Sequence, residues 1–193
     1  ILDGLREDKP AILVGTQMLA KGHDLPNLTL VAIVGVDEGL HSVDFRASER
    51  LAQLVVQVAG RAGRASKPGS VLLQTHHPDH PMLHSLLRGG YAAVATELLE
   101  ERRLLELPPF AHQVLLRADA LGRTEVDAFL AQAHAAIGPP GDLRIAGPMP
   151  APMPLRAGRH RGQLLVEAGS RARLHTFLRP WQHALVGLPE ARK

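Results

Sequence analysis

The sequence predicts a mixed α/β fold in two parts: a mostly parallel sheet with helices, then a small α+β domain. Short, fully apolar segments alternate with amphipathic helical segments over residues 11–75, as in parallel sheets covered on both faces. After Pro108 and Pro109 the expected order becomes β-α-β-β-α, typical of a split β-α-β unit that lacks its last strand. We therefore expect domains at 1–106 and 107–193.

Three apolar runs predict strands in the first part, at residues 11–14, 28–36 and 70–75. Residues 47–59 carry leucine and valine at helical spacing and stop at Gly60, which predicts an amphipathic helix. The other expected elements are a helix at 82–106 broken at Gly89-Gly90, strands at 114–117, 143–145 and 163–167, a helix at 124–137 capped by Thr124, a Pro/Met loop at 148–154, and a helix from Ser170 toward Leu185.

Composition narrows the class of protein. Apolar residues make up 45% and charged residues 21% of the 193 residues, which excludes a disordered or collagen-like chain. With 0 Cys, disulfides and thiolate metal sites are excluded, which suits the cytosol. No apolar run approaches the roughly 20 residues of a membrane span, so no membrane partner is expected. The chain begins with Ile, and we expect it to be a fragment truncated at both ends.

Charge is distributed unevenly between the two parts. Residues 1–106 hold 11 basic and 13 acidic side chains, whereas residues 107–193 hold 11 basic and 6 acidic ones. Ten of the eleven basic side chains in residues 107–193 are arginine, whose planar fork of donors suits phosphate and carboxylate groups. A polyanion partner for the second part and a simple coding bias toward arginine are both compatible with this excess.

The end of the helix at 47–59 has the most specific pattern. Gln57 is followed by two Gly-Arg pairs, which contain Arg61 and Arg64. Two guanidinium groups after glycines suit the equatorial oxygens of a transferring phosphoryl group. The simpler interpretation is a glycine helix stop followed by solvated arginines.

A second candidate set follows the first predicted strand. It consists of Gly15, Thr16, Gly22 and Asp24. Because ligands gather beyond the carboxyl ends of strands in open α/β sheets, we expect these residues on the same face as the two arginines.

Taken together, these motifs resemble motifs V and VI of superfamily 2 helicases. More closely, the stretches GTQMLAKGHDLPNLTLV, VDFRASER, QLVVQVAGRAGR and LQTHHPDHP resemble the primosomal replication-restart helicases, in that family's order and spacing. The resemblance implies a partial RecA-like helicase lobe in residues 1–106 and a C-terminal DNA- and partner-binding domain in residues 107–193.

The resemblance also implies roles for the first-part residues. Arg61 and Arg64 match arginine fingers that reach a nucleotide on the other lobe, and Gln57 matches a residue on the γ-phosphate side. Thr16 and Gly22 match positions that couple DNA to the nucleotide. In the family, ATP and Mg²⁺ are held mainly by the upstream lobe, and Zn²⁺ by a cysteine-rich module that is also upstream. The fragment alone is therefore expected to be inactive.

In the second part, the resemblance and the charge indicate two basic segments. Arg156, Arg159 and Arg161 fall in an expected loop before the last strand, where phosphate contact and plain solvation are alternatives. Arg171 and Arg173 begin the last helix, where an anion would offset the positive helix end. In the family this region helps bind the acidic tail of single-stranded DNA-binding protein.

Three other groups have simpler interpretations. A histidine-rich stretch is expected as a structural loop rather than a metal site; it contains His76, His77, His80 and His84. Two aromatic residues, Phe177 and Trp181, are expected in the core rather than as a base-stacking platform. A charged stretch is expected to form ion pairs that support the helix at 47–59; it contains Asp44, Arg46, Glu49 and Arg50.

The family implies an ATP-dependent 3′→5′ DNA helicase that binds stalled or repaired forks and directs primosome assembly. Its expected partners are forked and single-stranded DNA, the tail of single-stranded DNA-binding protein and other primosome proteins, in a cytoplasmic, nucleoid-associated setting. The alternative is a fork-binding scaffold of the same family that has lost hydrolysis.

Overall fold

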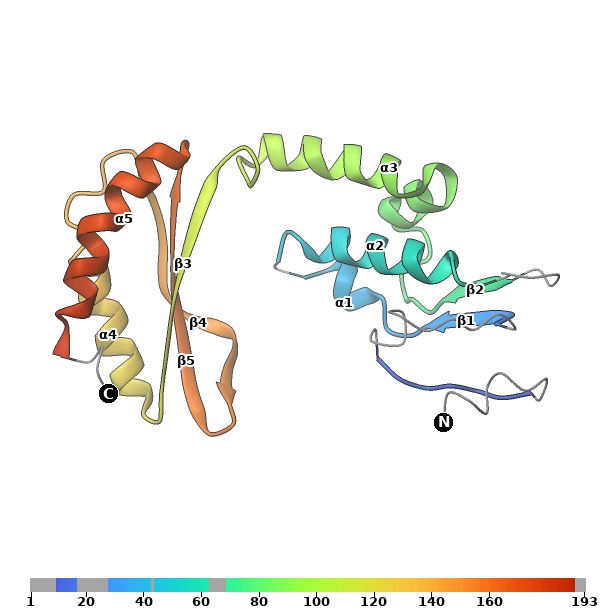
Figure 1. The fold of residues 1–193 in the computed structure, drawn as a ribbon, viewed down its shortest axis with the longest axis horizontal. Coiled ribbons are helices and arrows are strands. Elements are labelled where there is room, and N and C mark those ends of the chain that lie inside the picture. The colour runs from blue at the N-terminus through green and yellow to red at the C-terminus, as the bar shows by residue number, and fades with distance from the viewer. Residues whose placement is uncertain (1–9, 17–27, 43, 63–68, 190–193) are drawn as a thin grey trace. The chain divides into compact units, whose positions relative to one another are not determined.

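The computed structural model describes residues 10–16, 28–42, 44–62 and 69–189 of the chain. These residues form two compact units, 1–100 and 101–193, and each has its own hydrophobic core (Figure 1). Both units combine strands with helices, so the predicted mixed α/β class is confirmed. Within the described residues, no helix has the combination of length and apolar character that crossing a bilayer requires.

In the part of the first unit that the structure describes, two strands form a parallel sheet with Leu30 opposite Ser70. Its core joins this sheet to the helices through Val36, Leu51, Val55 and Leu86, among other buried residues. The elements are β1 (Leu30–Ile33), α1 (Asp37–Leu40), α2 (Ala47–Ala59), β2 (Ser70–Leu73) and α3 (Pro81–Leu104).

Helix α2 has the predicted bounds, and its predicted inner face is buried at Leu51, Val55 and Val58. The long helix α3 is also confirmed, together with its break. Gly90 has φ 65° and ψ −161°, a conformation that residues with a Cβ rarely adopt, so the glycine permits the kink.

The strand predicted at residues 11–14 is not formed. Residues 11–14 belong to no strand, and Ile12 is 93% and Val14 87% exposed. An apolar run shows that a segment can pack in a sheet, but only a neighbouring strand supplies the hydrogen bonds. Among the described residues, none pairs with this run.

The second unit is a three-stranded antiparallel sheet in the order β3-β5-β4, so both outer strands run opposite to the central strand. Helices α4 and α5 cover one face of this sheet (Figure 1). The elements are β3 (His112–Ala120), α4 (Arg123–Ala135), β4 (Arg144–Arg156), β5 (Arg159–Ala168) and α5 (Arg171–Val186).

The core of this unit lies between the sheet and the two helices. Leu164 and Val166 on β5 and Leu130 on α4 are at most 1% exposed. Trp181 is 3% exposed and Phe177 packs beside it, with ring centroids 5.2 Å apart. The expected core role of these two aromatic side chains is confirmed.

Strand β4 corrects the expected Pro/Met loop. The strand continues through this segment to Arg156, with register shifts between Ala146 and Met149 and between Pro150 and Leu155. Among the described residues β4 pairs only with β5, and an edge strand tolerates proline because its outer N–H groups have no partner to lose.

Two further local expectations were wrong. The N-cap of α4 is Gly122, not Thr124: the side chain of Glu125 accepts a hydrogen bond from the Gly122 N–H at 3.2 Å. The expected basic loop is a tight hairpin turn of Ala157 and Gly158. Both have positive φ, as in the type I′ turn that matches strand twist. By contrast, Ser170 caps α5 as predicted, because its Oγ accepts from the Arg173 N–H at 3.2 Å.

Candidate functional site

The C-terminal end of α2 presents two of the predicted phosphate-contact residues. Gln57 is exposed and Arg61 is half-buried. The backbone keeps right-handed helical angles at Gly60, and the Arg61 N–H donates to the Val58 carbonyl at 3.0 Å. Because the turn continues, the spacing of four residues places Gln57 and Arg61 on one side of the helix end. Arg64 lies outside the described residues.

The start of α2 is fixed against α1. The Ser48 hydroxyl donates to the Gly39 carbonyl at 3.2 Å. A Cβ at Gly39 would lie 3.0 Å from the side chain of Leu51, so the small residue allows close packing of the two helices. The position of the functional end of α2 therefore depends on this packing.

Asp44 makes the ion pair that the charged stretch predicts. Its carboxylate accepts from the Arg50 guanidinium and, at 3.0 Å, from the Arg46 N–H just before α2. Partial burial raises the pKa of Asp44, but the bonds from Arg46 and Arg50 outweigh it, and the pKa is lower than its usual value.

A second contact joins α2 to α3. The Tyr91 hydroxyl donates to Glu49 Oε1 at 3.2 Å and accepts from Gln53 Nε2 at 3.0 Å. Gln53 Nε2 also donates to Glu49 at 3.3 Å. Because Tyr91 directly follows the kink at Gly90, the kink brings the second part of α3 to α2.

The other predicted nucleotide-coupling residues are only partly described. Gly15 and Thr16 are exposed and lie before β1, outside any helix or strand. Gly22 and Asp24 lie outside the described residues. The grouping of this set with Arg61 therefore stays a prediction.

The histidine-rich stretch packs as a structural cluster. The ring of His41 lies 4.5 Å from that of His77 and 5.7 Å from that of His80. His80 Nδ1 accepts from the Met82 N–H at 3.2 Å, at the start of α3. Among the described residues, no three potential ligands are grouped to hold a metal ion.

Burial lowers the pKa of His80, and the nearby rings of His41 and His77 lower it further. The neutral imidazole is the form that can accept the Met82 hydrogen bond, so both effects favour the capping form.

In the second unit, the β4–β5 hairpin carries three predicted contact residues. Arg156 is exposed and stands opposite Arg159 in the register. The Arg159 guanidinium bonds Asp119, with Nε at 3.2 Å and Nη2 at 3.0 Å from Oδ1. Arg161 is half-buried and faces Asp119 across the β3–β5 pair.

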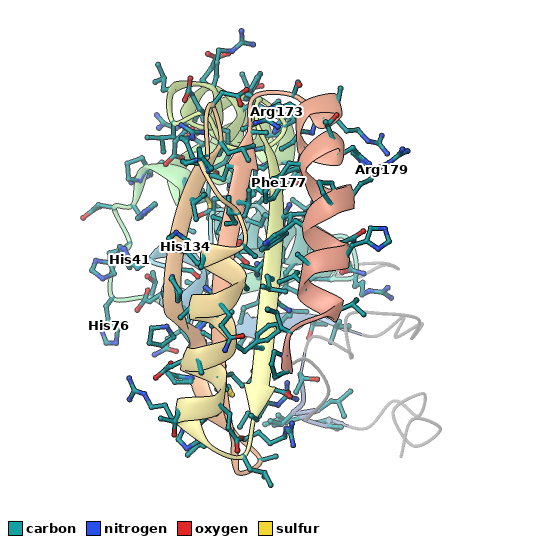
Figure 2. The ribbon with its side chains drawn as sticks, turned by 90° about the vertical axis from the view of Figure 1, so that its left-hand side faces the viewer. His41, His76, His134, Arg173, Phe177 and Arg179 are labelled. Carbon is teal, nitrogen blue, oxygen red and sulfur yellow. The ribbon has the colours of Figure 1, made fainter. Side chains whose placement is uncertain are left out.

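The start of α5 carries the other two predicted contact residues. Arg173 Nε donates to Asp142 Oδ1 at 2.6 Å, and this bond lowers the pKa of Asp142. Arg171 is exposed, and its Nε lies 3.4 Å from His175 Nε2. Figure 2 shows Arg179 on the outer side of the same helix, with Phe177 on the side of the sheet.

These two groups of arginines lie at opposite ends of β5. The hairpin precedes β5 and α5 follows it, so the ten residues of β5 place them about 30 Å apart. Sequence reasoning missed Arg117 on β3, which lines a hollow together with Arg161. The sequence pattern of β3 could have revealed it. Apolar and polar residues alternate along the second half of this strand, and Arg117 stands at a position that faces away from the core.

Two family models match the chain. Residues 1–66 match the helicase conserved C-terminal domain, and residues 103–193 match the primosomal protein N C-terminal domain. The first match contains α2 and Arg61, and the second contains the whole three-stranded sheet with α4 and α5.

Curated relatives match nearly the whole chain. The replication restart protein PriA of Haemophilus influenzae is 51% identical over 95% of the chain and 25% of its own length. The proteins of the same name from Synechocystis and Bacillus subtilis are 39% and 34% identical, over 86% and 93% of the chain and 20% and 22% of their own lengths. The chain thus spans about a quarter of these relatives, and it belongs to the PriA family of replication restart proteins.

Proposed function

We propose that this chain is part of an ATP-dependent 3′→5′ DNA helicase that binds stalled or repaired replication forks and directs primosome assembly. The observation that carries the proposal is the end of α2. Gln57 lies in the last turn of α2 and Arg61 follows the Gly60 cap, and residues 1–66 match a helicase domain. In this proposal residues 1–106 are part of the second RecA-like lobe. The β3–α4–β4–β5–α5 unit is a split β-α-β domain that binds DNA and partners.

Arg61 acts in this proposal as an arginine finger, together with Arg64. ATP and Mg²⁺ are held mainly by the other lobe, and Zn²⁺ by a module outside this chain. The guanidinium of Arg61 donates hydrogen bonds to phosphoryl oxygens whose negative charge grows in the transition state. Gln57 donates on the γ-phosphate side. The residues present fit a triphosphate, because both side chains are hydrogen-bond donors and neither is fully buried.

In this proposal the contacts at the start of α2 hold Arg61 in the position that catalysis requires. A donor helps the transition state only when it is held in place before the reaction. The Asp44–Arg50 pair, the Ser48–Gly39 bond and the contacts of Tyr91 position α2 and hence Arg61. Gly15, Thr16, Gly22 and Asp24 then couple bound DNA to the nucleotide.

In the second unit, Arg156, Arg159 and Arg161 contact DNA near the hairpin, and Arg171 and Arg173 contact the acidic tail of single-stranded DNA-binding protein. The surplus of basic over acidic side chains in residues 107–193 supports both contacts. Other primosome proteins are further partners in this proposal.

The test is steady-state ATP hydrolysis by the complete protein, with and without forked DNA. Arg61→Ala is expected to lower the DNA-stimulated kcat by about 10³-fold or more, in line with arginine fingers elsewhere, and to leave fork affinity within about twofold. Arg88→Ala is the matched control, because it also removes one guanidinium from this unit. Within the described part of the chain, the Arg88 guanidinium bonds only the His84 carbonyl of its own helix, at 3.3 Å.

Equal loss of hydrolysis and fork binding in Arg61→Ala would assign Arg61 to structure or DNA contact instead. Fork binding without hydrolysis by the unmodified protein would support the alternative, a restart scaffold that recruits partners without a motor.

A further inference from the structure

The face of the second unit's sheet that α4 and α5 leave uncovered contains a hollow of about 310 Å³. Arg117 and Asp119 project into it from β3, Arg161 from β5 and Ala151 from β4, because alternate residues of a strand face the same side. Ala118 and Gly162 complete its lining. All three strands of the sheet therefore contribute to one concave site.

The charges around this hollow do not cancel. Asp119 is its only acidic lining residue, and it is already bonded by Arg159, at 3.0 and 3.2 Å to the carboxylate and at 3.1 Å to the carbonyl. The guanidinium groups of Arg117 and Arg161 make no hydrogen bond or ion pair with any residue that the structure describes. Two guanidinium groups thus line the hollow, and the one carboxylate beside them is already paired with Arg159.

The spacing of these two groups suits a single oxyanion. Asp119 pairs with Arg161 and Arg117 pairs with Gln163, so Arg117 is the diagonal neighbour of Arg161. Diagonal neighbours on one face lie about 7 Å apart, within reach of long side chains that converge on one group. A guanidinium fork donates two parallel hydrogen bonds to a phosphate.

The lining of the hollow is held rigidly from behind. Gly162 packs against α4 so closely that a Cβ there would lie 2.6 Å from Leu130 Cδ1 and 2.9 Å from Val126 Cγ1. Because α4 packs directly behind β5, this strand cannot move away from a ligand bound in the hollow. Binding therefore requires little ordering of the backbone, which favours affinity.

We propose that this hollow is a phosphate-ester site in which Arg117 and Arg161 bind the oxyanion and Arg159 neutralises the charge of Asp119. Its volume is at the lower end for ligand pockets, which suits one nucleotide unit rather than a bare ion. The phosphate belongs either to the backbone of a nucleic-acid strand or to a free mononucleotide. The inference deepens the proposed DNA contact of this unit and does not depend on ATP hydrolysis.

The test measures binding of a fluorescein-labelled 15-mer of thymidylate to the 193-residue chain by fluorescence anisotropy. Arg117→Gln and Arg161→Gln are each expected to weaken binding about tenfold or more, as for loss of a hydrogen bond to a charged group. Each is also expected to reduce the slope of log affinity against log salt concentration by about 0.7, the value for one phosphate contact on a single strand.

Arg123→Gln is the matched control. It removes the same charge from the same unit, but Arg123 lies on α4 beside Asp127, at 3.5 Å. Its affinity is expected to stay within about twofold of the unmodified chain. Asp119→Asn is expected to strengthen binding, because it removes the one carboxylate of the hollow and releases Arg159. Circular dichroism shows whether each variant is folded.

Competition with thymidine monophosphate and with inorganic phosphate distinguishes the two sources of the phosphate, a nucleic-acid backbone and a free mononucleotide. Displacement of the oligomer by millimolar monophosphate, lost in Arg117→Gln, indicates a mononucleotide site. Oligomer binding that monophosphate does not displace indicates a strand backbone. If folded Arg117→Gln and Arg161→Gln bind as the control does, the proposal is wrong. Because no hydrolysis is measured, this outcome is independent of whether the complete protein is a motor.

Discussion

The indole Nε1 of Trp181 donates a hydrogen bond to the backbone carbonyl of Ala133 at 2.9 Å, which joins α5 to α4 inside the core. This carbonyl lies in the last turn of α4. Its neighbours accept from the Ala136, Ile137 and Gly138 N–H groups. Trp181 thus donates to a backbone carbonyl, that of Ala133, which would otherwise be buried at the end of α4 without a partner.

Trp181→Phe is expected to lower the free energy of unfolding by about 2 kcal/mol, because it leaves the Ala133 carbonyl unsatisfied and removes buried volume. Urea denaturation followed by far-UV circular dichroism measures this, since Trp181 is the only tryptophan available for fluorescence. Gln182→Ala, on the exposed side of the same helix, is the control and is expected to change stability by less than about 0.5 kcal/mol. Equal stabilities would show that the hydrogen bond contributes nothing.

Gly162→Ala is expected to cost about 1–3 kcal/mol, because its Cβ would overlap the side chains of Leu130 and Val126 on α4. Gly169→Ala is a close control at the end of the same strand. No atom lies within 4 Å of its added Cβ, and its stability should remain within about 0.5 kcal/mol of the unmodified chain. Thermal unfolding of both variants compares them. A neutral Gly162→Ala would mean that α4 moves away at little cost.

The first unit is expected to lose stability as the pH falls below about 6.5, the ordinary pKa of histidine. The pKa of His80 is lowered in the folded state, so the unfolded chain binds protons first, and acid favours unfolding until His80 itself is protonated. Protonation also removes the acceptor that caps α3. Urea denaturation between pH 7.5 and 5 measures the effect.

His80→Asn keeps a capping acceptor but cannot be protonated in this range. It is expected to match the unmodified chain at pH 7.5 and to lose less stability at pH 5. A parallel loss in both proteins would assign the acid effect to other groups.

Arg171→Ala and Arg173→Ala remove the same charge from the first turn of α5, but we expect different results. Arg173 is bonded to Asp142, and its loss is expected to lower the unfolding temperature. Arg171 is exposed, and among the described residues its side chain bonds only His175 of its own helix. Its loss is therefore expected to leave that temperature unchanged and to weaken binding of an acidic peptide. Differential scanning calorimetry and peptide titration separate the two roles. A lower unfolding temperature in Arg171→Ala would contradict this assignment.

The sequence predicted best the elements that local pattern controls. Helix α2 combines a regular apolar face with a glycine at its end, and both signals are local to the segment. The Ser170 cap and the kink at Gly90 are equally local. The class of the fold follows from such elements, so the mixed α/β prediction did not require the structure.

The errors arose where a distant part of the chain decides the outcome. Residues 11–14 have the composition of a buried strand, but composition does not supply a pairing partner. The proline-rich segment extends as β4 because β5 pairs with it on one side only. Arg117 was missed because its importance depends on Arg161, which is far away in sequence and adjacent only across the β3–β5 pair.

The prolines of β4 also determine how the sheet can grow. Residues 148, 150, 152 and 154 are all proline, so this edge strand lacks four of its backbone N–H donors. An edge without donors is a poor template for a foreign strand, and this protects the unit from edge-to-edge aggregation. The outer edge of β3 contains no proline. Sheet extension, whether by a neighbouring segment or by a second molecule, is therefore directed to β3.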